Sequence, residues 1–320
     1  MSTTPAKLFV VFGASDPERQ YAVQLLDDLQ QQYGLDAAIQ YGFAICNGKQ
    51  VFASNAYQAD SISVTPVLDK DATIFFFECG GDQLRKQFEQ YKIVQLDHHL
   101  PTHYGYGKPP EDFLEASSLG QLIYELAKRK LLPRLWGYAG IANDSDCRRF
   151  KYDSYYQTWS VMVDSGEHDE GKYWVPIPKD YVLCAAADHC LGAAYRGECP
   201  GVWPQDLLYW RVKTRATFED KSVDALLDDI CRASKELQNA VSDGQPYADL
   251  RGRFIPELPE AAARLGIPFI AELTEKDGRK KVVLQVAPAK LVERFMAGEI
   301  IPGLKNVYGD SARGFAGGYL

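Results

Sequence analysis

The sequence predicts an α/β protein with a mainly parallel sheet in a first lobe and a smaller α/β lobe at its C-terminal end. Through the first 150 residues, short apolar segments alternate with longer amphipathic segments, which is typical of parallel strands joined by helices that cover both faces of a sheet. The chain of 320 residues is long enough for two domains. Its 46% hydrophobic and 24% charged residues are ordinary for a globular protein with its own core.

The elements of the first lobe follow from two patterns along the chain. A buried-type strand is expected over residues 8–12 and ends at Gly13; a helix follows over 18–32, where apolar residues recur on one face. The same patterns predict, in chain order, a strand over 73–77, a helix over 83–90, a strand over 93–96, a helix over 117–130 and a strand over 136–142. The carboxyl ends of such parallel strands share one rim of the sheet.

Three regions are expected along the chain. Residues 1–150 form the first lobe, and residues 151–244 form an intermediate segment with an amphipathic connector helix over 222–240. Residues 245–320 form a C-terminal, substrate-binding lobe that contains a strand over 281–286. Substrate would lie in the cleft between the two lobes.

Charge limits the kinds of partner that the protein can bind, and cysteine content indicates its compartment. The net charge of −8 and pI of about 5.3 exclude the basic footprint of a duplex-binding protein. We therefore expect no duplex DNA partner, and any anionic substrate should be small. Formation of a homodimer is compatible with the sequence. Seven scattered cysteines favour a reducing compartment, and no apolar run approaches the ~20 residues of a membrane span. A cytoplasmic protein with no membrane association is expected.

The most informative motif is Asp97-His98-His99, which directly follows the strand expected over 93–96. Three of the five histidines of the chain, His98, His99 and His103, fall within six residues. A strand that ends in a carboxylate and two imidazoles places metal-binding or proton-transferring groups at the rim where ligands bind in open α/β folds. A solvated pair of histidines in a loop is the alternative for the motif taken alone.

Acidic residues follow the other expected strands as well. They are Asp16 and Glu18 after the first strand, Glu78 and Asp82 after the second, and Asp144 and Asp146 after the last. A single Asp after a strand is most simply a helix cap or a turn residue. Carboxylates and imidazoles gathered at one rim instead suit manganese or magnesium, which can activate water and neutralise a phosphoryl group.

At these residues the chain resembles the DHH phosphoesterases, a family that includes RecJ-type exonucleases, short-oligonucleotide and cyclic-dinucleotide phosphodiesterases and family II pyrophosphatases. Asp97-His98-His99 is similar to the motif that names the family. The segment 115–122 resembles its Ser/Thr-rich helix start, and 140–145 resembles its Gly-Ile strand that ends in a metal-binding Asp. Asp16-Pro17-Glu18 resembles its Asp-x-Asp element.

The resemblance implies a metal-dependent phosphoesterase whose first lobe is a DHH-like metal-binding domain. Its Mn²⁺ (or Mg²⁺) would be held by the positions that match the family's ligands, namely Asp16, Glu18, Glu78, His98 and Asp144. Asp97 would orient the imidazoles, and His99 would stabilise charge on the phosphoryl group. The substrate would be a small nucleotide or a short single-stranded oligonucleotide, cleaved at a phosphodiester or phosphoanhydride.

Three positions depart from the family pattern. Phe12 stands where the family has a metal-binding His, and Glu replaces Asp at Glu18 and Glu78. The protein could then hold one metal, two with altered geometry, or none, and His189 is the candidate for a substitute ligand. A degenerate member that binds nucleotides or serves in assembly, without catalysis, is the alternative function.

Substrate contacts are expected from basic and glycine-rich segments. The C-terminal segment 308–318 resembles the family's phosphate-binding segment, with Arg313 in place of a His and with the amides of Gly317 and Gly318 as anion donors. Arg148 and Arg196 are further candidates for phosphate binding; for Arg196 the alternative is a surface ion pair. Around His189, the cysteines Cys184, Cys190 and Cys199 are read as small buried residues of a helix or, alternatively, as zinc ligands.

Overall fold

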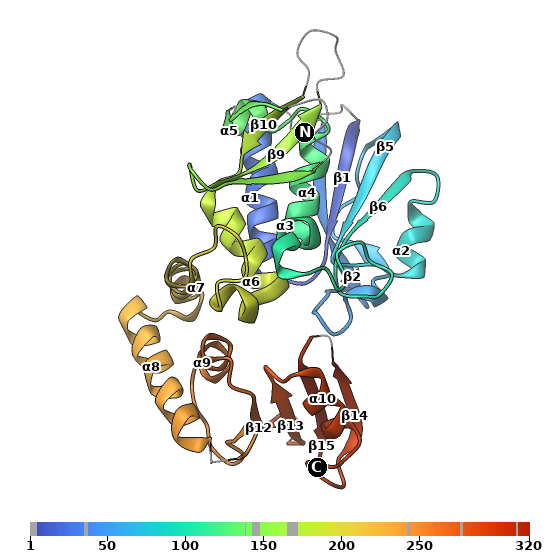
Figure 1. Ribbon diagram of the computed structural model, residues 1–320. Coiled ribbons are helices and arrows are strands. Elements are labelled where there is room, and N and C mark those ends of the chain that lie inside the picture. The colour runs from blue at the N-terminus through green and yellow to red at the C-terminus, as the bar shows by residue number, and fades with distance from the viewer. Residues whose placement is uncertain are drawn as a thin grey trace. The chain divides into compact units, whose positions relative to one another are not determined.

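The computed structural model describes residues 5–34, 38–137, 139–142, 148–164, 172–241, 244–275, 278–311 and 313–320. It is a mixed α/β structure that divides into two compact units (Figure 1). Unit 1 comprises Met1–Cys190 with Cys199–Val202, and unit 2 comprises Leu191–Glu198 with Trp203–Leu320. Among the residues described, no helix has the length and apolarity needed to cross a membrane.

The first sheet of unit 1 is mainly parallel, as expected. Its central strands run in the order β2-β1-β5-β6 and all pair in parallel: β2 (Ile39–Cys46), β1 (Ala6–Phe12), β5 (Leu68–Phe77) and β6 (Lys92–Leu96). Two short strands, β3 (Lys49–Gln50) and β4 (Ser61–Ile62), add antiparallel pairs to β2. The sequence patterns predict β1, β5 and β6, whereas β2 was not expected.

Strand register brings three strand ends to one level of this sheet. Phe12 pairs with Phe77, and Phe77 pairs with Leu96, so β1, β5 and β6 end together. The residues that follow these strands therefore leave the sheet side by side, which places Glu78 and Asp97 at a common rim.

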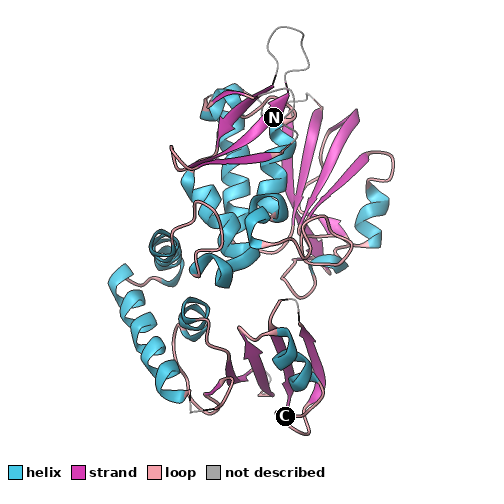
Figure 2. Ribbon diagram, in the orientation of Figure 1, coloured by secondary structure: helices cyan, strands magenta, loops and turns pink. Residues whose placement is uncertain are grey.

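Helices cover both faces of the sheet (Figure 2). Helix α2 (Asp82–Gln87) covers one face, where Leu84 packs with Phe9 and Phe76 in a shared apolar cluster. Helix α1 (Pro17–Tyr33) covers the other, because Arg19 stacks on the ring of Phe43 and Asp27 accepts a hydrogen bond from the hydroxyl of Tyr41. The short elements η1 (Ala56–Gln58), η2 (Pro110–Asp112) and α3 (Phe113–Ala116) precede helix α4 (Ser118–Ala127), which is capped by Ser117.

A second, antiparallel sheet completes unit 1 and corrects one expectation. Its order is β7-β10-β9-β8: β7 (Gly140–Ile141), β10 (Lys172–Pro176), β9 (Thr158–Asp164) and β8 (Phe150–Asp153). The strand expected over 136–142 is β7 in this sheet, preceded by helix α5 (Pro133–Trp136), and is not a strand of the parallel sheet. Gly140 and Ile141 pair instead with Trp174 and Tyr173 of β10, which follows later in the chain, so their partner depends on a contact that local periodicity does not show. Helix α6 (Lys179–Tyr195) follows and is interrupted at Cys190, where φ is −148° and ψ is 46°.

Unit 2 contains helices α7 (Pro204–Glu219), α8 (Val223–Ala240), α9 (Leu258–Leu265) and α10 (Ala289–Met296). Its sheet runs β11-β12-β13-β15-β14: β11 (Ala248–Asp249), β12 (Phe269–Thr274), β13 (Lys280–Gln285), β15 (Phe315–Tyr319) and β14 (Lys305–Asp310). The expected helix over 222–240 is α8, capped by Ser222. Its apolar side packs against α9 and β12, so α8 belongs to the core of unit 2.

The close packing of Gly13 against the backbone of Glu78 yields a test. A Cβ atom at Gly13 would lie 2.1 Å from the carbonyl oxygen of Glu78, and backbone cannot give way as a flexible side chain can. We expect Gly13→Ala to lower the free energy of unfolding by about 2 kcal/mol or more, measured by urea denaturation. Gly80→Ala is the matched control, since its Cβ would make an ordinary 3.7 Å contact with Tyr57; equal effects of the two substitutions would contradict this packing.

Candidate metal centre

The candidate site lies where the strand order of the parallel sheet reverses. From β1 the chain passes to β2 on one side, and it then returns to form β5 on the other side of β1. The loops after β1 and β5 diverge at such a position and leave a crevice at the carboxyl ends of the strands, where α/β proteins bind ligands. Glu78 lies in the loop after β5, and Glu18 lies in the first turn of α1, directly after the loop that follows β1.

Four side chains gather there with metal-ligand chemistry. Glu18, Glu78, His98 and Asp188 each offer a ligand atom, and these atoms all lie within 4.8 Å of one another. Nε2 of His98 lies 3.2 Å from Oδ2 of Asp188, and Nδ1 of His98 lies 3.8 Å from Oε1 of Glu78. A second group of the same kind consists of Glu78, His98 and His99.

Glu18 is the most deeply buried of these ligands, with 1% of its surface exposed. Its Oε1 accepts a hydrogen bond of 2.8 Å from the amide of Leu119, in the first turn of α4. Its Oε2 is also buried and receives no hydrogen bond from the described residues. An ionised carboxylate oxygen buried without a donor is costly, and a cation would satisfy it.

Glu78 is held in a strained conformation at the end of β5. Its φ of 51° lies in the left-handed region that favours glycine. Two hydrogen bonds fix it: Ser118 Oγ donates to Oε1 at 2.9 Å, and the Glu78 amide donates to the carbonyl of Leu96 at 3.1 Å. The surrounding structure therefore directs this carboxylate into the group.

The acidic side chains raise one another's pKa. Burial raises the pKa of Glu18 and Glu78 well above the ordinary carboxyl range, and the charge of Asp188 raises both further. Burial also raises the pKa of Asp16, with a further increase from Asp188. Carboxylates that cannot all ionise together need shared protons or a bound cation. This donor set of carboxylate oxygens and imidazole nitrogens fits a divalent cation.

Asp97 is buried and organises the loop that carries the histidines. Its Oδ1 lies 2.8 Å from the amide nitrogen of His98, 3.0 Å from Nδ1 of His99 and 3.0 Å from Nδ1 of His103. The hydroxyl of Tyr57 donates to Oδ2 at 2.9 Å. Burial alone would raise the pKa of Asp97, but the hydrogen bonds from His99 and the charges of His103 and His99 outweigh it and lower the pKa to about 2. Asp97 therefore stays ionised and orients its neighbours.

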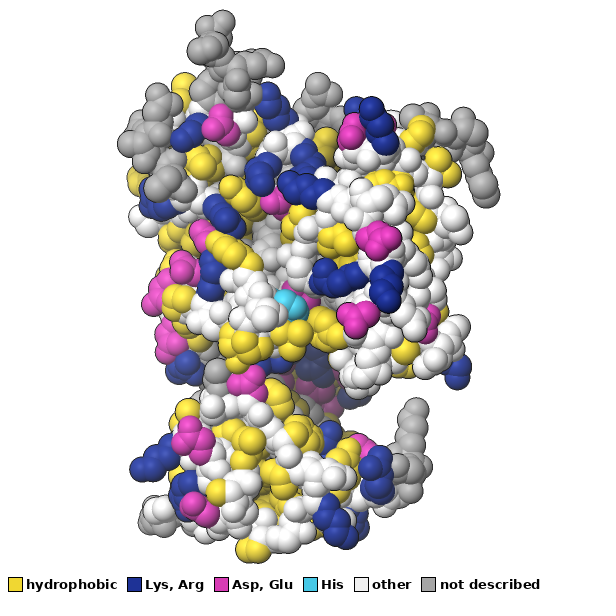
Figure 3. Space-filling model, turned by 90° about the vertical axis from the view of Figure 1, so that its right-hand side faces the viewer, with side chains coloured by type: hydrophobic (Ala, Val, Ile, Leu, Met, Phe, Trp, Pro, Cys, Tyr) yellow, Lys and Arg dark blue, Asp and Glu magenta, His cyan; other side chains and the backbone are white. Residues whose placement is uncertain are grey.

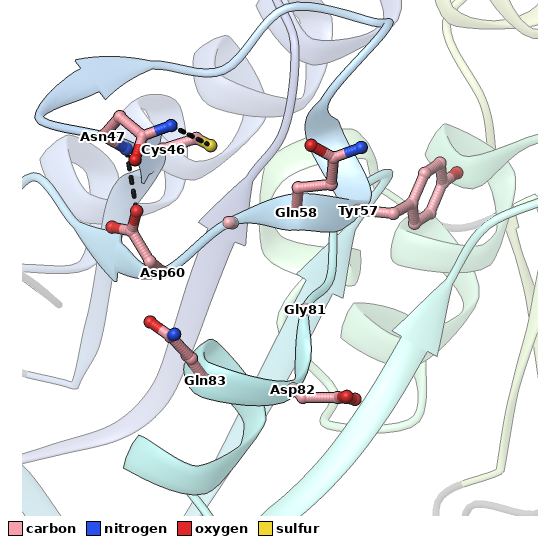
Figure 4. A pocket seen from close by; sticks show the side chains of 9 residues that line it. Cys46, Asn47, Tyr57, Gln58, Asp60, Gly81, Asp82 and Gln83 are labelled. Carbon is pink, nitrogen blue, oxygen red and sulfur yellow. Dashed lines mark hydrogen bonds between the residues drawn. The ribbon is translucent and has the colours of Figure 1, made fainter.

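A pocket of about 470 Å³ is lined by residues of the segments 46–47, 57–60 and 81–83 (Figure 4). Its polar lining consists mainly of side-chain amides and carboxylates, and the described lining residues include no Lys or Arg. The polar lining residues are Asn47, Gln58, Asp60, Asp82 and Gln83, together with the phenol of Tyr57. Tyr57 belongs both to this lining and to the hydrogen bonds of Asp97. The pocket suits an uncharged group with hydrogen-bond donors better than a phosphate.

The remaining positions that the sequence matched to metal ligands of the family are not among the four side chains described above. Asp16 caps α1, accepting a hydrogen bond of 2.7 Å from the amide of Arg19, and its carboxylate also interacts with that of Glu78. Asp144 and Asp146 lie outside the described residues. Phe12 is fully buried, with its ring 5.3 Å from that of Phe77, as part of the apolar core beneath the rim.

The segment around His189 contributes a ligand that sequence reasoning missed. Nε2 of His189 lies 3.1 Å from the carbonyl oxygen of Lys108, and its ring packs edge-on against His98 with centroids 5.4 Å apart. The neighbouring residue Asp188 is the one whose carboxylate joins the metal-binding group. The signal was present in the small residues before Asp188, which allow α6 to approach closely, but one helix position decides which side chain enters the site.

The expected substrate-binding residues lie in both units. Arg148 is exposed before β8, and Arg196 forms an exposed, two-pronged ion pair with Glu198, the arrangement that the sequence left open as its alternative. Arg313 follows β14, with its guanidinium 5.6 Å from the ring centroid of Phe315. Gly317 pairs with Val283 of β13 and Tyr308 of β14, and Gly318 pairs with Val282 of β13, so both glycines lie within the sheet. The phosphate-binding roles of these residues remain predictions.

The chain matches no known family model, no curated protein and no solved structure. The fold and the site therefore define its class by themselves: an α/β protein with a candidate metal centre at the carboxyl ends of parallel strands.

Asp97→Asn tests the role of the buried carboxylate. A depressed pKa means that Asp97 stabilises the folded protein above the ordinary carboxyl pKa, near 4, and loses this contribution as the pH falls toward 2. We expect the free energy of unfolding of the variant at pH 7 to be about 2 kcal/mol lower than that of the natural protein. This difference should shrink between pH 4 and pH 2. Denaturant unfolding at each pH measures it.

Asp60→Asn is the control for this experiment, because Asp60 also has a lowered pKa but is held by hydrogen bonds from Ser61 and Asn47 in an open position. Its effect should be much smaller. An Asp97→Asn effect of the same size at pH 3 and pH 7 would contradict the assignment.

Proposed function

We propose that the protein is a divalent metal-dependent phosphoesterase that cleaves a phosphodiester or phosphoanhydride of a small nucleotide or short oligonucleotide. The observation that carries this proposal is the convergence of Glu18, Glu78, His98 and Asp188, together with a buried Glu18 oxygen that receives no hydrogen bond from the described residues. These four residues would hold Mn²⁺ or Mg²⁺, with Asp16 beside them. When bound, the metal would activate water and neutralise phosphoryl charge.

The residues around the metal position would orient the substrate and handle protons. Asp97 accepts a hydrogen bond from Nδ1 of His99, which leaves Nε2 of His99 as the atom that can contact a phosphoryl oxygen. Ser118, bonded to Glu78, holds that carboxylate in place. The amide-lined pocket beside Tyr57 would receive the uncharged part of a nucleotide, its base or its sugar.

Surface charge also favours a small substrate. On the face seen in Figure 3, Lys and Arg side chains are interspersed with Asp and Glu rather than joined in one basic stripe. With the net charge of −8, this distribution gives little attraction for a long polyphosphate backbone. A nucleotide or short oligonucleotide asks for only local charge neutralisation, which a bound cation supplies.

Activity against short single-stranded RNA in the presence of Mn²⁺ is the direct test. We expect Glu78→Gln and His98→Gln each to lower turnover about 100-fold or more. Loss of a residue that only supports a metal ligand typically lowers activity about 10- to 100-fold, and loss of a ligand itself should cost at least as much. Glu125→Gln is the matched control: Glu125 lies on α4 and pairs with Arg129 and Lys128 away from the metal-binding group. Duplex substrates should be poor. Tight Mn²⁺ binding without hydrolysis of any nucleotide would instead support a non-catalytic binding module.

Metal binding should be linked to pH. The cation binds the ionised carboxylates, whereas the raised pKa values of Glu18 and Glu78 keep protons on this group above the ordinary carboxyl range. Mn²⁺ affinity should therefore rise with pH, and binding should release protons. Titration calorimetry at pH 6, 7 and 8, in buffers that differ in ionisation enthalpy, measures both quantities. Glu78→Gln should release fewer protons; pH-independent binding without proton release would refute this coupling.

A further inference from the structure

Two cysteine side chains meet in unit 1 where the chain leaves that unit and returns to it. Sγ of Cys190 lies 3.0 Å from Sγ of Cys199, and both residues belong to unit 1, whereas Leu191–Glu198 between them belongs to unit 2. A movement of about 1 Å would bring the sulfurs to the bonding distance of a disulfide, about 2.05 Å. Cys199 is buried, and Cys190 is half-buried.

We propose that Cys190 and Cys199 form a reversible disulfide, an oxidative modification site that reacts with small disulfides such as oxidised glutathione. In a reducing compartment a disulfide of this kind responds to redox conditions rather than serving as a permanent staple. The pair is distinguished from the other described cysteines by mutual contact: Cys231, for example, is exposed on α8 in unit 2.

The Cys199 end of the pair is anchored to the second sheet. The indole Nε1 of Trp159 in β9 donates a hydrogen bond of 2.8 Å to the carbonyl of Pro200. Gly201 adopts φ 72° and packs so closely on Tyr152 of β8 that a Cβ atom would lie 2.4 Å from the ring. These contacts fix the segment that carries Cys199 without any help from a disulfide.

The Cys190 end belongs to helix α6, which also carries the candidate ligand Asp188. The backbone at Cys190 departs from helical geometry, with φ −148° and ψ 46°. This break frees Cys190 from the side-chain direction of a regular helix, so that its sulfur reaches Cys199. A disulfide would therefore tie α6 at this break, two residues after Asp188, to the segment that is anchored on the second sheet.

Exposure sets the order of the chemical steps. The thiolate of the more accessible Cys190, its proton released to water, attacks one sulfur of the small disulfide, and one thiolate leaves. The thiolate of Cys199 then attacks the Cys190 sulfur, which forms the Cys190–Cys199 bond and expels the second small thiolate. Two protein thiols are oxidised, and one small disulfide is reduced to two thiols that take up the released protons.

The cross-link requires neither a bound metal nor catalytic activity; only its effect on Asp188 rests on the metal centre proposed above. Because restraint of a ligand-bearing segment lowers the ordering cost of binding, the oxidised protein should bind Mn²⁺ more tightly than the reduced protein, by roughly threefold.

Glutathione redox buffers provide the test. The full-length protein is equilibrated in buffers of increasing oxidising strength, alkylated, and analysed by peptide mass mapping. We expect a Cys190–Cys199 linked peptide to appear with a single midpoint, together with a rise in Tm of roughly a few degrees relative to the reduced protein. Cys199→Ser should abolish both changes, and Cys231→Ser should abolish neither. The comparison of oxidised with reduced natural protein needs no substitution.

Absence of the linked peptide at the most oxidising ratio, or Cys190 found only as a mixed disulfide with glutathione, would overturn the modification site. Calorimetry with Mn²⁺ on the oxidised and reduced forms separates its consequence: a linked peptide with unchanged Mn²⁺ affinity would overturn the effect on Asp188. Absence of phosphoesterase activity would bear on the function proposed above and not on the disulfide.

Discussion

The buried carboxylate of Asp97 is the interaction on which the site loop depends. Two backbone amides and a phenol donate to this one group, the His99 imidazole is hydrogen-bonded to it, and the His103 imidazole lies 3.0 Å from it. The strands beneath it end in register, so the loop starts from a fixed level of the sheet, and Asp97 then determines the path of the chain beyond that point. His98 and His99 take their positions from a group that needs no metal to be satisfied. The histidine side of the centre is therefore preorganised.

The carboxylate side of the centre has the opposite character. Glu18 and Glu78 are buried beside other acidic groups, and their repulsion is relieved only by protons or by a cation. The fold holds them there through contacts elsewhere: the first turn of α4 binds Glu18, and Ser118 binds Glu78. Local instability of this kind is typical of sites that bind or react, because the surrounding structure maintains an arrangement that the site residues alone would not adopt.

Sequence patterns predicted the parts of the structure that depend on local periodicity. The strands before Gly13, Glu78 and Asp97, the helices α1, α4 and α8, and the sharing of one rim all follow from apolar spacing and from the rules for parallel sheets. The sequence patterns did not predict which strands pair with each other. Residues 140–141 have the same apolar character as a strand of the first sheet, yet they pair with β10, because periodicity shows that a segment is extended and not which neighbour it joins. Asp188 was missed for a related reason: the small residues before it indicate that α6 can approach closely, but not which of its side chains enters the group.

The position of Asp188 in the chain has a consequence for biosynthesis. The residues from Glu18 to His99 emerge from the ribosome well before α6, and at ordinary elongation rates the delay is roughly several seconds. During that interval the parallel sheet can form with its acidic side chains already gathered but without the carboxylate that completes the group. Metal capture would then come late in synthesis, after the second sheet and α6 have docked, and a nascent chain interrupted before that stage would carry an incomplete, weakly binding cluster.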